Sequence, residues 1–128
     1  MKVLLDTCAF IWFNLEADEL SARALEIFEN LEEELYLSVV SSWEIAVKYS
    51  SGRLYLPEPP EVYIPDRRNV NRIHQLPLEE NAVFQEPKLP RLHGDPFDRM
   101  LVCQAIVGGM AILTPDEHIA QYPVRTIW

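Results

Sequence analysis

Five acidic residues stand where carboxylates from distant parts of the chain could share one site. They are Asp6, Glu44, Asp95, Asp98 and Asp116. Carboxylates within a few ångströms of one another raise one another's pKa or recruit a cation. A set of oxygen ligands suits Mg²⁺ or Mn²⁺ better than zinc. Two such ions, roughly 4 Å apart, would clamp a phosphodiester and activate a water molecule for in-line attack.

A structural interpretation is open for four of these acids. Ser41 and Glu44 have the spacing of a capping box, in which the glutamate bonds a backbone N–H at the start of a helix. The three later aspartates suit the first turns of helices, where caps and the helix dipole favour acids. Asp6 is the exception, because a carboxylate that ends a buried strand has little structural motive.

The elements that must position the acids alternate between strands and helices. Strands are predicted at 2–5, 35–39, 73–76, 110–113 and 124–127, and helices at 9–14, from Ser21, from Ser41, at 78–84, from Asp95 and at 115–120. This order predicts an α/β fold, a three-layer α/β/α sandwich with a mostly parallel central sheet. Right-handed crossovers then place the acids at one edge of the sheet, outside the carboxyl ends of the strands.

The helix that opens at Asp95 has the clearest signals of all. Asp95 suits the N-cap, Pro96 suits the first helical position, and a largely apolar run follows as far as Gly108. The helix is therefore predicted to be buried. Residues 57–71 are left unassigned, because they carry several prolines, including Pro65, and proline disfavours both helix interiors and central strands.

Composition excludes several classes of protein. The chain has 128 residues, of which 48% are hydrophobic, so a single globular domain over 1–128 is predicted. A net charge of −9 argues against tight binding of nucleic acid by bulk electrostatics, although metal ions change the sign of a cleft. No apolar run is long enough for a membrane span. Cys8 and Cys103 fit no metal or redox spacing, and we expect small buried hydrophobes in a reducing cytoplasm.

Three basic residues near the acids are weaker candidates for a functional role. His93 precedes the Asp95 turn and could approach a substrate, although a loop histidine is more often solvated. Arg99 follows Asp98 and is expected to contact substrate or to pair with an acid. Lys48, four residues after Glu44, suits an ion pair on a helix surface.

Four segments together resemble the PIN-domain nucleases, and specifically the VapC-like toxins of toxin–antitoxin systems. They are Leu-Leu-Asp-Thr-Cys-Ala-Phe-Ile-Trp from Leu4, Ser-Val-Val-Ser-Ser-Trp-Glu-Ile-Ala from Ser38, His-Gly-Asp-Pro-Phe-Asp-Arg from His93 and Leu-Thr-Pro-Asp from Leu113. The segments arrive in the family's order and spacing, so the resemblance covers nearly the whole chain. Asp-Pro-Phe-Asp-Arg is the most specific block.

The resemblance implies catalytic and metal-binding roles for Asp6, Glu44, Asp98 and Asp116, with Asp95 as a further ligand or a supporting group. It places Thr7 and Thr114 beside the metal, where substrate binds, and we add His93 and Arg99 as candidate substrate contacts. It also implies Mg²⁺- or Mn²⁺-dependent cleavage of RNA, a homodimer, and inhibition by a small antitoxin protein.

The sequence departs from the family pattern at Cys8, at Gly94 and in residues 57–71, but none of these departures touches the acids. Two other functions remain as alternatives. One is a PIN-like module that binds a partner without catalysis. The other is a phosphoaspartyl hydrolase with Asp6 as nucleophile, although such enzymes carry a second aspartate where this chain has Cys8.

Four apolar residues early in the chain are expected to be exposed and to serve an antitoxin groove or a dimer face. They are Trp12, Phe13, Leu15 and Phe28.

Overall fold

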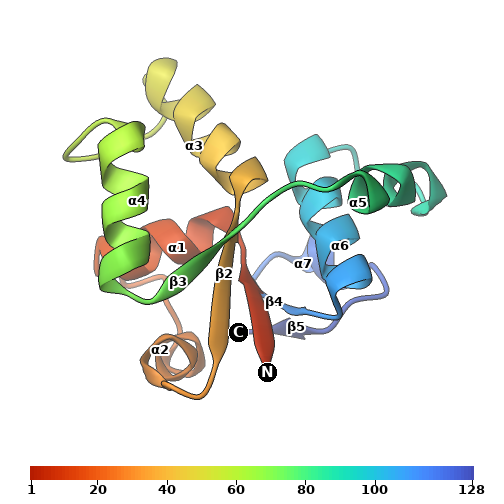
Figure 1. Ribbon diagram of the computed structural model, residues 1–128, viewed down its shortest axis with the longest axis horizontal. Coiled ribbons are helices and arrows are strands. Elements are labelled where there is room, and N and C mark those ends of the chain that lie inside the picture. Colours follow the sequence, from red (N-terminus) through yellow and green to blue (C-terminus); the bar gives the residue numbers. More distant parts are fainter.

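Five short parallel strands form the centre of the molecule, and the computed structural model describes all residues from Met1 to Trp128 (Figure 1). The strands are β1 (Lys2–Leu5), β2 (Glu34–Ser38), β3 (Ile73–Leu76), β4 (Ala111–Leu113) and β5 (Thr126–Ile127). They lie in the order β3-β2-β1-β4-β5, and every neighbouring pair is parallel. The predicted α/β/α sandwich is confirmed, with a sheet that is parallel throughout rather than mostly so.

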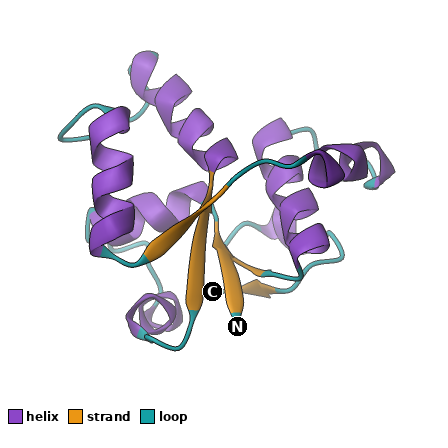
Figure 2. Ribbon diagram, viewed as in Figure 1, coloured by secondary structure: helices purple, strands orange, loops and turns teal.

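Helices cover both faces of this sheet (Figure 2). They are α1 (Thr7–Asn14), α2 (Ala22–Glu29), α3 (Val39–Ser50), α4 (Pro60–Val70), α5 (Glu80–Gln85), α6 (Pro96–Gly108) and α7 (Glu117–Ala120), with a 3₁₀ turn at Glu86–Lys88. In Figure 1 the helices α1, α2 and α4 lie on one side of the strands, and α5, α6 and α7 lie on the other. None of the seven α-helices combines the length and the apolar character needed to cross a bilayer.

The two faces of the sheet have separate hydrophobic cores. Val3 and Leu5 of β1 belong to one core, which also contains side chains from α1, α2 and α4. Leu4 belongs to the other core, together with Ile112 of β4 and Leu101 of α6. Successive side chains of a strand point to opposite faces, so a strand with both faces covered needs apolar residues at consecutive positions. This requirement explains the continuous apolar run that opens the sequence.

The third helix begins earlier than the sequence predicts. We expected Ser41 to open it, but α3 begins at Val39, and the Ser38 hydroxyl accepts the hydrogen bond from the Val40 N–H at 3.0 Å. The capping-box interpretation of Glu44 is therefore wrong. Its side chain lies beyond the first turn of α3 and is 6% exposed, so it needs a different explanation.

Residues 60–70 form a helix, although their prolines left them unassigned. Pro60 occupies the first helical position, where a missing N–H costs nothing. Pro65 lies inside the helix and cannot make the usual backbone bond. Tyr63 and Ile64 are buried against the sheet, and this tertiary packing outweighs the local penalty of the proline.

Helix α6 follows its sequence signals closely. The Asp95 carboxylate accepts hydrogen bonds from the N–H groups of Phe97 and Asp98, and Gly109 ends the helix in the left-handed conformation with φ of 63°. Since α6 runs antiparallel to the strands, its first turn lies at the carboxyl edge of the sheet. This direction brings the Asp-Pro-Phe-Asp block beside the ends of β1 and β4.

Of the four early apolar residues expected to be exposed, only Leu15 is, at 43%. Phe28 is buried, and its ring stacks on that of Phe13 with centroids 4.0 Å apart. Trp12 and Phe13 are half-buried and pack against the first core. The expectation of an exposed face here is therefore wrong for Phe28, because α2 folds back over α1 and turns its apolar stripe inward. Cys103 is buried as predicted, and Cys8 is half-buried.

Candidate active site

The predicted acids meet at the carboxyl edge of the sheet. Strand β1 pairs with β2 on one side and with β4 on the other, so the connections that follow β1 and β4 diverge at this point of the sheet. Ligand sites of open parallel sheets form at such switch points. A pocket of about 370 Å³ lies here. Its lining includes all five predicted acids, Asp6, Glu44, Asp95, Asp98 and Asp116, together with the two cations Lys48 and Arg53.

Asp6 is the most rigidly held of these acids. It directly follows β1, is 5% exposed, and accepts hydrogen bonds from the Thr7 N–H at 2.7 Å and from the Thr114 hydroxyl at 2.7 Å. Burial raises the pKa of its carboxyl group above the ordinary value, although these two donors oppose the shift. Both oxygens of Asp6 are thus oriented before any ligand arrives.

Glu44 is linked to Asp6 through Thr7. The Thr7 hydroxyl donates to Glu44 Oε1 at 2.7 Å and lies 2.9 Å from Ser41 Oγ. Lys48 Nζ contacts the other carboxylate oxygen of Glu44, as the spacing of four residues predicted. The hydrogen bond to Glu44 raises the pKa of Lys48, so the lysine stays charged at neutral pH.

Asp98 lies among the other four acids and has a strongly raised pKa. Its Oδ2 lies 3.2 Å from His93 Nε2, while its side chain keeps 13% of its surface exposed. Burial, with repulsion from Asp6, Asp95 and the other two acids, raises the pKa of its carboxyl group to about 8. The other four acids are therefore close enough to oppose the ionisation of Asp98.

Asp95 and Asp116 each have a structural role as well. Asp95 caps α6, and Asp116 caps α7 by accepting the His118 N–H at 2.8 Å. Both nevertheless line the pocket, so capping and membership of the acidic group are compatible. The Thr114 hydroxyl accepts the Asp116 N–H at 3.0 Å, which connects this acid to Asp6.

Of the four residues expected to contact substrate, three lie at the site and one points away from it. Thr7 lines the pocket and Thr114 bonds Asp6, while His93 bonds Asp98. Arg99 is 2% exposed, and its guanidinium pairs with Glu86 at 2.7 Å. The prediction that Arg99 contacts substrate is therefore wrong, because its side chain points into the protein. The structure has the other expected contact, an ion pair between Arg99 and an acid.

Sequence reasoning missed two participants near the site. Arg53 lines the pocket from the turn after α3, and its position depends on where that helix ends. Tyr122 bonds both His93 and Arg99 through its hydroxyl, which no motif spacing indicates. Trp43 is 62% exposed and packs edge-on against Phe97, and this contact joins α3 to the first turn of α6.

A divalent cation fits the chemistry of this pocket. Five carboxylates face two cations, and a bound ion would relieve the repulsion that raises the pKa of Asp98. No three carboxylate, thiol or imidazole groups lie close enough to hold one ion without moving. Mg²⁺ commonly keeps several water ligands and takes only one or two carboxylates directly, so a preformed cage is not required.

The raised pKa of Asp98 predicts how stability depends on pH. In the metal-free protein this carboxyl has a pKa of about 8, against 3.8 for the unperturbed group. The folded state therefore binds the proton more tightly than the unfolded chain does, and the associated stability is complete below the unfolded pKa and lost as pH rises through about 8. Thermal melts of the wild type and of Asp98→Asn, both in chelator, should differ most above that pH and converge on acidification. A difference that does not change with pH would contradict the shift.

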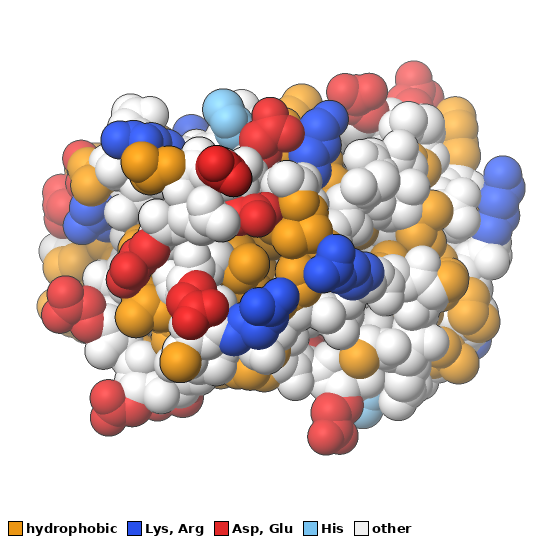
Figure 3. All heavy atoms as spheres, turned by 90° about the horizontal axis from the view of Figure 1, so that it is seen from below, with side chains coloured by type: hydrophobic (Ala, Val, Ile, Leu, Met, Phe, Trp, Pro, Cys, Tyr) orange, Lys and Arg blue, Asp and Glu red, His pale blue; other side chains and the backbone are white.

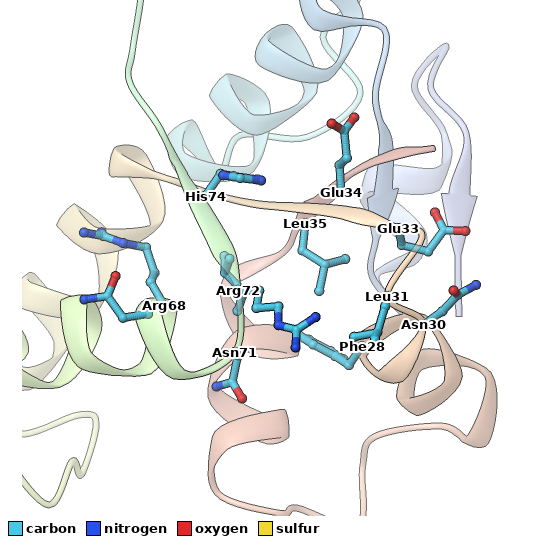
Figure 4. A pocket seen from close by; sticks show the side chains of 12 residues that line it. Phe28, Asn30, Leu31, Glu33, Glu34, Leu35, Arg68, Asn71, Arg72 and His74 are labelled. Carbon is cyan, nitrogen blue, oxygen red and sulfur yellow. The ribbon is translucent and has the colours of Figure 1, made fainter.

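The opposite edge of the sheet has a different character. Figure 3 views the molecule from the side of the amino ends of the strands, where acidic, basic and apolar side chains are interspersed. A pocket of about 440 Å³ lies at the start of β2 and β3 (Figure 4). Arg68 and Arg72 line it opposite Glu33 and Glu34, so charges of both signs are present. None of the five predicted acids lines this pocket, and all five line the pocket at the carboxyl edge.

Comparison with known proteins places this arrangement in a family. The family model described as PIN domain matches residues 3–124. Ribonuclease VapC16 of Mycobacterium tuberculosis is 33% identical over 101 residues, which cover 79% of this chain and 67% of that protein. Ribonuclease VapC22 of the same organism is 26% identical over 131 aligned positions, which cover 98% of both chains. The crystal structure of VapBC2 from Rickettsia felis bound to a DNA fragment from their promoter matches with a TM-score of 0.75 at 13% identity, over 99% of this chain and 98% of that one.

Proposed function

The chain belongs to the PIN domain family, and from this premise we propose that it is a metal-dependent endoribonuclease that acts as the toxin of a toxin–antitoxin pair. The single observation that carries the proposal is the meeting of five carboxylates in one pocket at the switch point of the sheet. The curated relatives support the choice of RNA as substrate, because both are named ribonucleases.

Asp6, Glu44 and Asp98 would hold Mg²⁺ or Mn²⁺, with Asp116 and Asp95 completing the acidic set directly or through water. When bound, the ion supplies a Lewis acid for the scissile phosphate and lowers the pKa of a water molecule. Asp6 suits a direct ligand, because Thr7 and Thr114 already fix the directions of its two oxygens.

Lys48 and Arg53 would bind the RNA backbone. Both line the pocket beside the acids, and both are cations in a chain whose net charge is −9. In the free protein the Lys48 ammonium neutralises Glu44. With Glu44 engaged by a bound cation, the Lys48 ammonium would be free to donate to a phosphate oxygen. Local cations therefore compensate for a surface that would otherwise repel a polyanion.

A phosphoaspartyl hydrolase receives no support from the geometry of Asp6. Such enzymes carry a second aspartate two residues after the nucleophile, and Cys8 occupies that position here, with its thiol 3.5 Å from Asp6 Oδ2. A small antitoxin as inhibitor and a homodimer as the working assembly belong to the proposal, on the strength of the resemblance to VapC-like toxins and of the VapBC2 structure.

Removal of divalent cations tests the proposal directly. The purified, antitoxin-free chain should cleave single-stranded RNA in Mg²⁺ or Mn²⁺, fall to the uncatalysed background in EDTA, and recover when the cation is returned in excess. Gel analysis of a labelled RNA measures the cleavage, and circular dichroism in EDTA shows whether the fold persists. Cleavage that continues undiminished in EDTA would overturn metal dependence. Absence of cleavage under every condition, with Mn²⁺ failing to bind, would favour a non-catalytic module.

A further inference from the structure

A chain of hydrogen bonds runs from the second core to Asp98. The Arg99 Nη1 group donates to the Tyr122 hydroxyl oxygen at 3.0 Å. The same hydroxyl lies 2.7 Å from His93 Nδ1, and His93 Nε2 lies 3.2 Å from Asp98 Oδ2. Three elements meet in this chain: the first turn of α6, the loop before it, and the segment after α7.

The donor chemistry of Arg99 gives this chain a direction. A guanidinium only donates, so the Tyr122 oxygen must accept from it and its own O–H is free to donate. The hydroxyl has one other partner, His93 Nδ1 at 2.7 Å, so its buried O–H finds an acceptor only if Nδ1 accepts that proton. With Nδ1 acting as an acceptor, the proton of a neutral imidazole is on Nε2, which faces Asp98 Oδ2 at 3.2 Å as a donor.

Arg99 is an unusually rigid anchor for such a chain. Its guanidinium bonds Glu86 Oε1 at 2.7 Å, the Pro90 carbonyl oxygen at 2.9 Å and the Glu86 carbonyl oxygen at 3.2 Å. The side chain is 2% exposed, so these bonds are shielded from water. The Tyr122 oxygen, itself in a residue that is 3% exposed, cannot find a competing water donor easily.

The His93 ring is also fixed by packing. It stacks in parallel on His118, with centroids 5.4 Å apart, and lies tilted against the Tyr122 ring at the same separation. The imidazole therefore has little freedom to turn away from Asp98. Groups that hydrogen-bond a carboxylate or imidazole near a metal orient it and change affinity or rate by about 10- to 100-fold when removed.

We propose that His93 is a positioning residue that orients the Asp98 carboxylate, and that Tyr122, held by Arg99, fixes His93 as the tautomer protonated at Nε2. This assignment rests on the proposed function for its effect on cleavage, but not for the tautomer itself. Arg99 thereby affects the active site without touching the substrate.

The tautomer is measured by two-bond proton–nitrogen correlation spectra of the uniformly ¹⁵N-labelled chain in metal-free alkaline buffer. The wild type should show His93 with a bare Nδ1 and a protonated Nε2. Tyr122→Phe should give a mixture of tautomers. Tyr63→Phe is the matched control, because Tyr63 is also 3% exposed and its hydroxyl has no hydrogen-bond partner. A wild-type ring protonated at Nδ1, or a Tyr122→Phe spectrum identical to that of the wild type, would overturn the proposal.

Cleavage kinetics in Mg²⁺ provide the second readout. Tyr122→Phe should lower kcat about tenfold with little change in KM, whereas Tyr63→Phe should not change either constant. His93→Gln keeps an amide donor near the Nε2 position and should cleave faster than His93→Ala. Adding Tyr122→Phe to His93→Gln should cost almost nothing, because glutamine needs no tautomer.

If the two substitutions lower kcat additively in that double variant, the proposed hydrogen-bond chain from Tyr122 through His93 is contradicted. If the wild type cleaves no RNA, the proposed function fails, while the tautomer spectra still decide the proposal about His93.

Discussion

Asp98→Asn should abolish RNA cleavage and, at the same time, raise the melting temperature of the metal-free protein. Asparagine is close in shape to aspartate, but it removes the buried charge that Asp6 and Asp95 repel. Burial and this repulsion raise the pKa of Asp98 to about 8. It also removes an anionic ligand from the proposed metal site. We expect a loss in kcat/KM of at least about a thousandfold, which corresponds to about 4 kcal/mol of transition-state stabilisation.

The two effects are measured by initial rates of RNA cleavage in Mg²⁺ and by thermal melts in EDTA above the pKa of Asp98. Glu61→Gln is a matched control. Glu61 is an exposed acid in the first turn of α4, so its substitution, like that of Asp98 in the first turn of α6, removes a favourable interaction with a helix dipole. It should leave the cleavage rate unchanged. An Asp98→Asn protein that cleaves at the wild-type rate would contradict the proposed mechanism, and one that melts lower in EDTA would contradict the account of charge repulsion.

Arg99→Met should destabilise the fold severely. Methionine has similar length and fills the space, but it removes the donor to the Glu86 carboxylate and to the Tyr122 hydroxyl. The Glu86 and Pro90 carbonyls keep a backbone N–H donor each. Breaking a fully buried ion pair on one side costs about 3–5 kcal/mol, and the 29% exposure of the Glu86 side chain places the expected loss near the lower end of that range. Such a loss is still a large part of the about 5–15 kcal/mol that typically stabilises a domain. The midpoint of urea unfolding should therefore fall sharply.

Equilibrium unfolding in urea, followed by circular dichroism, measures this loss. Arg99→Lys should recover only part of the stability, because an ammonium cannot reproduce the planar fork that contacts Glu86 and Pro90 together. Arg23→Met, on an exposed position of α2, controls for the loss of one positive charge. A fall of less than about 1 kcal/mol for Arg99→Met would show that the buried pair is not important for stability.

The strands and the acidic site were predictable because short-range rules determine them. The apolar run at 2–5 indicates a strand with both faces covered, and Asp95 with Pro96 indicates the start of a helix through capping chemistry that depends on two residues alone. The meeting of the acids then follows from the handedness of parallel connections, because four of them lie just after a strand or at the start of a helix and Glu44 lies in the second turn of α3.

What could not be predicted depends on contacts between distant residues. Helix α4 contains Pro65 and forms because its neighbours Tyr63 and Ile64 are buried against the sheet, which no local rule indicates. Helix α3 begins at Val39 because Ser38 was available as a cap ahead of Ser41, and two nearby serines offer the same local signal. Arg99 lies next to Asp98 in sequence but points the other way, toward a partner 13 residues earlier in the chain.

The binding of Mn²⁺ to the metal-free protein, followed by isothermal titration calorimetry, tests the acidic site most directly. The wild type should bind the ion and release protons, because Asp98 must ionise to become a ligand and its pKa is about 8 in the free protein. Asp6→Asn and Asp98→Asn should each weaken binding beyond detection, while Glu61→Gln should bind as the wild type does. A wild-type chain that is folded but shows no heat of binding, or aspartate variants that bind Mn²⁺ with undiminished affinity, would contradict the account.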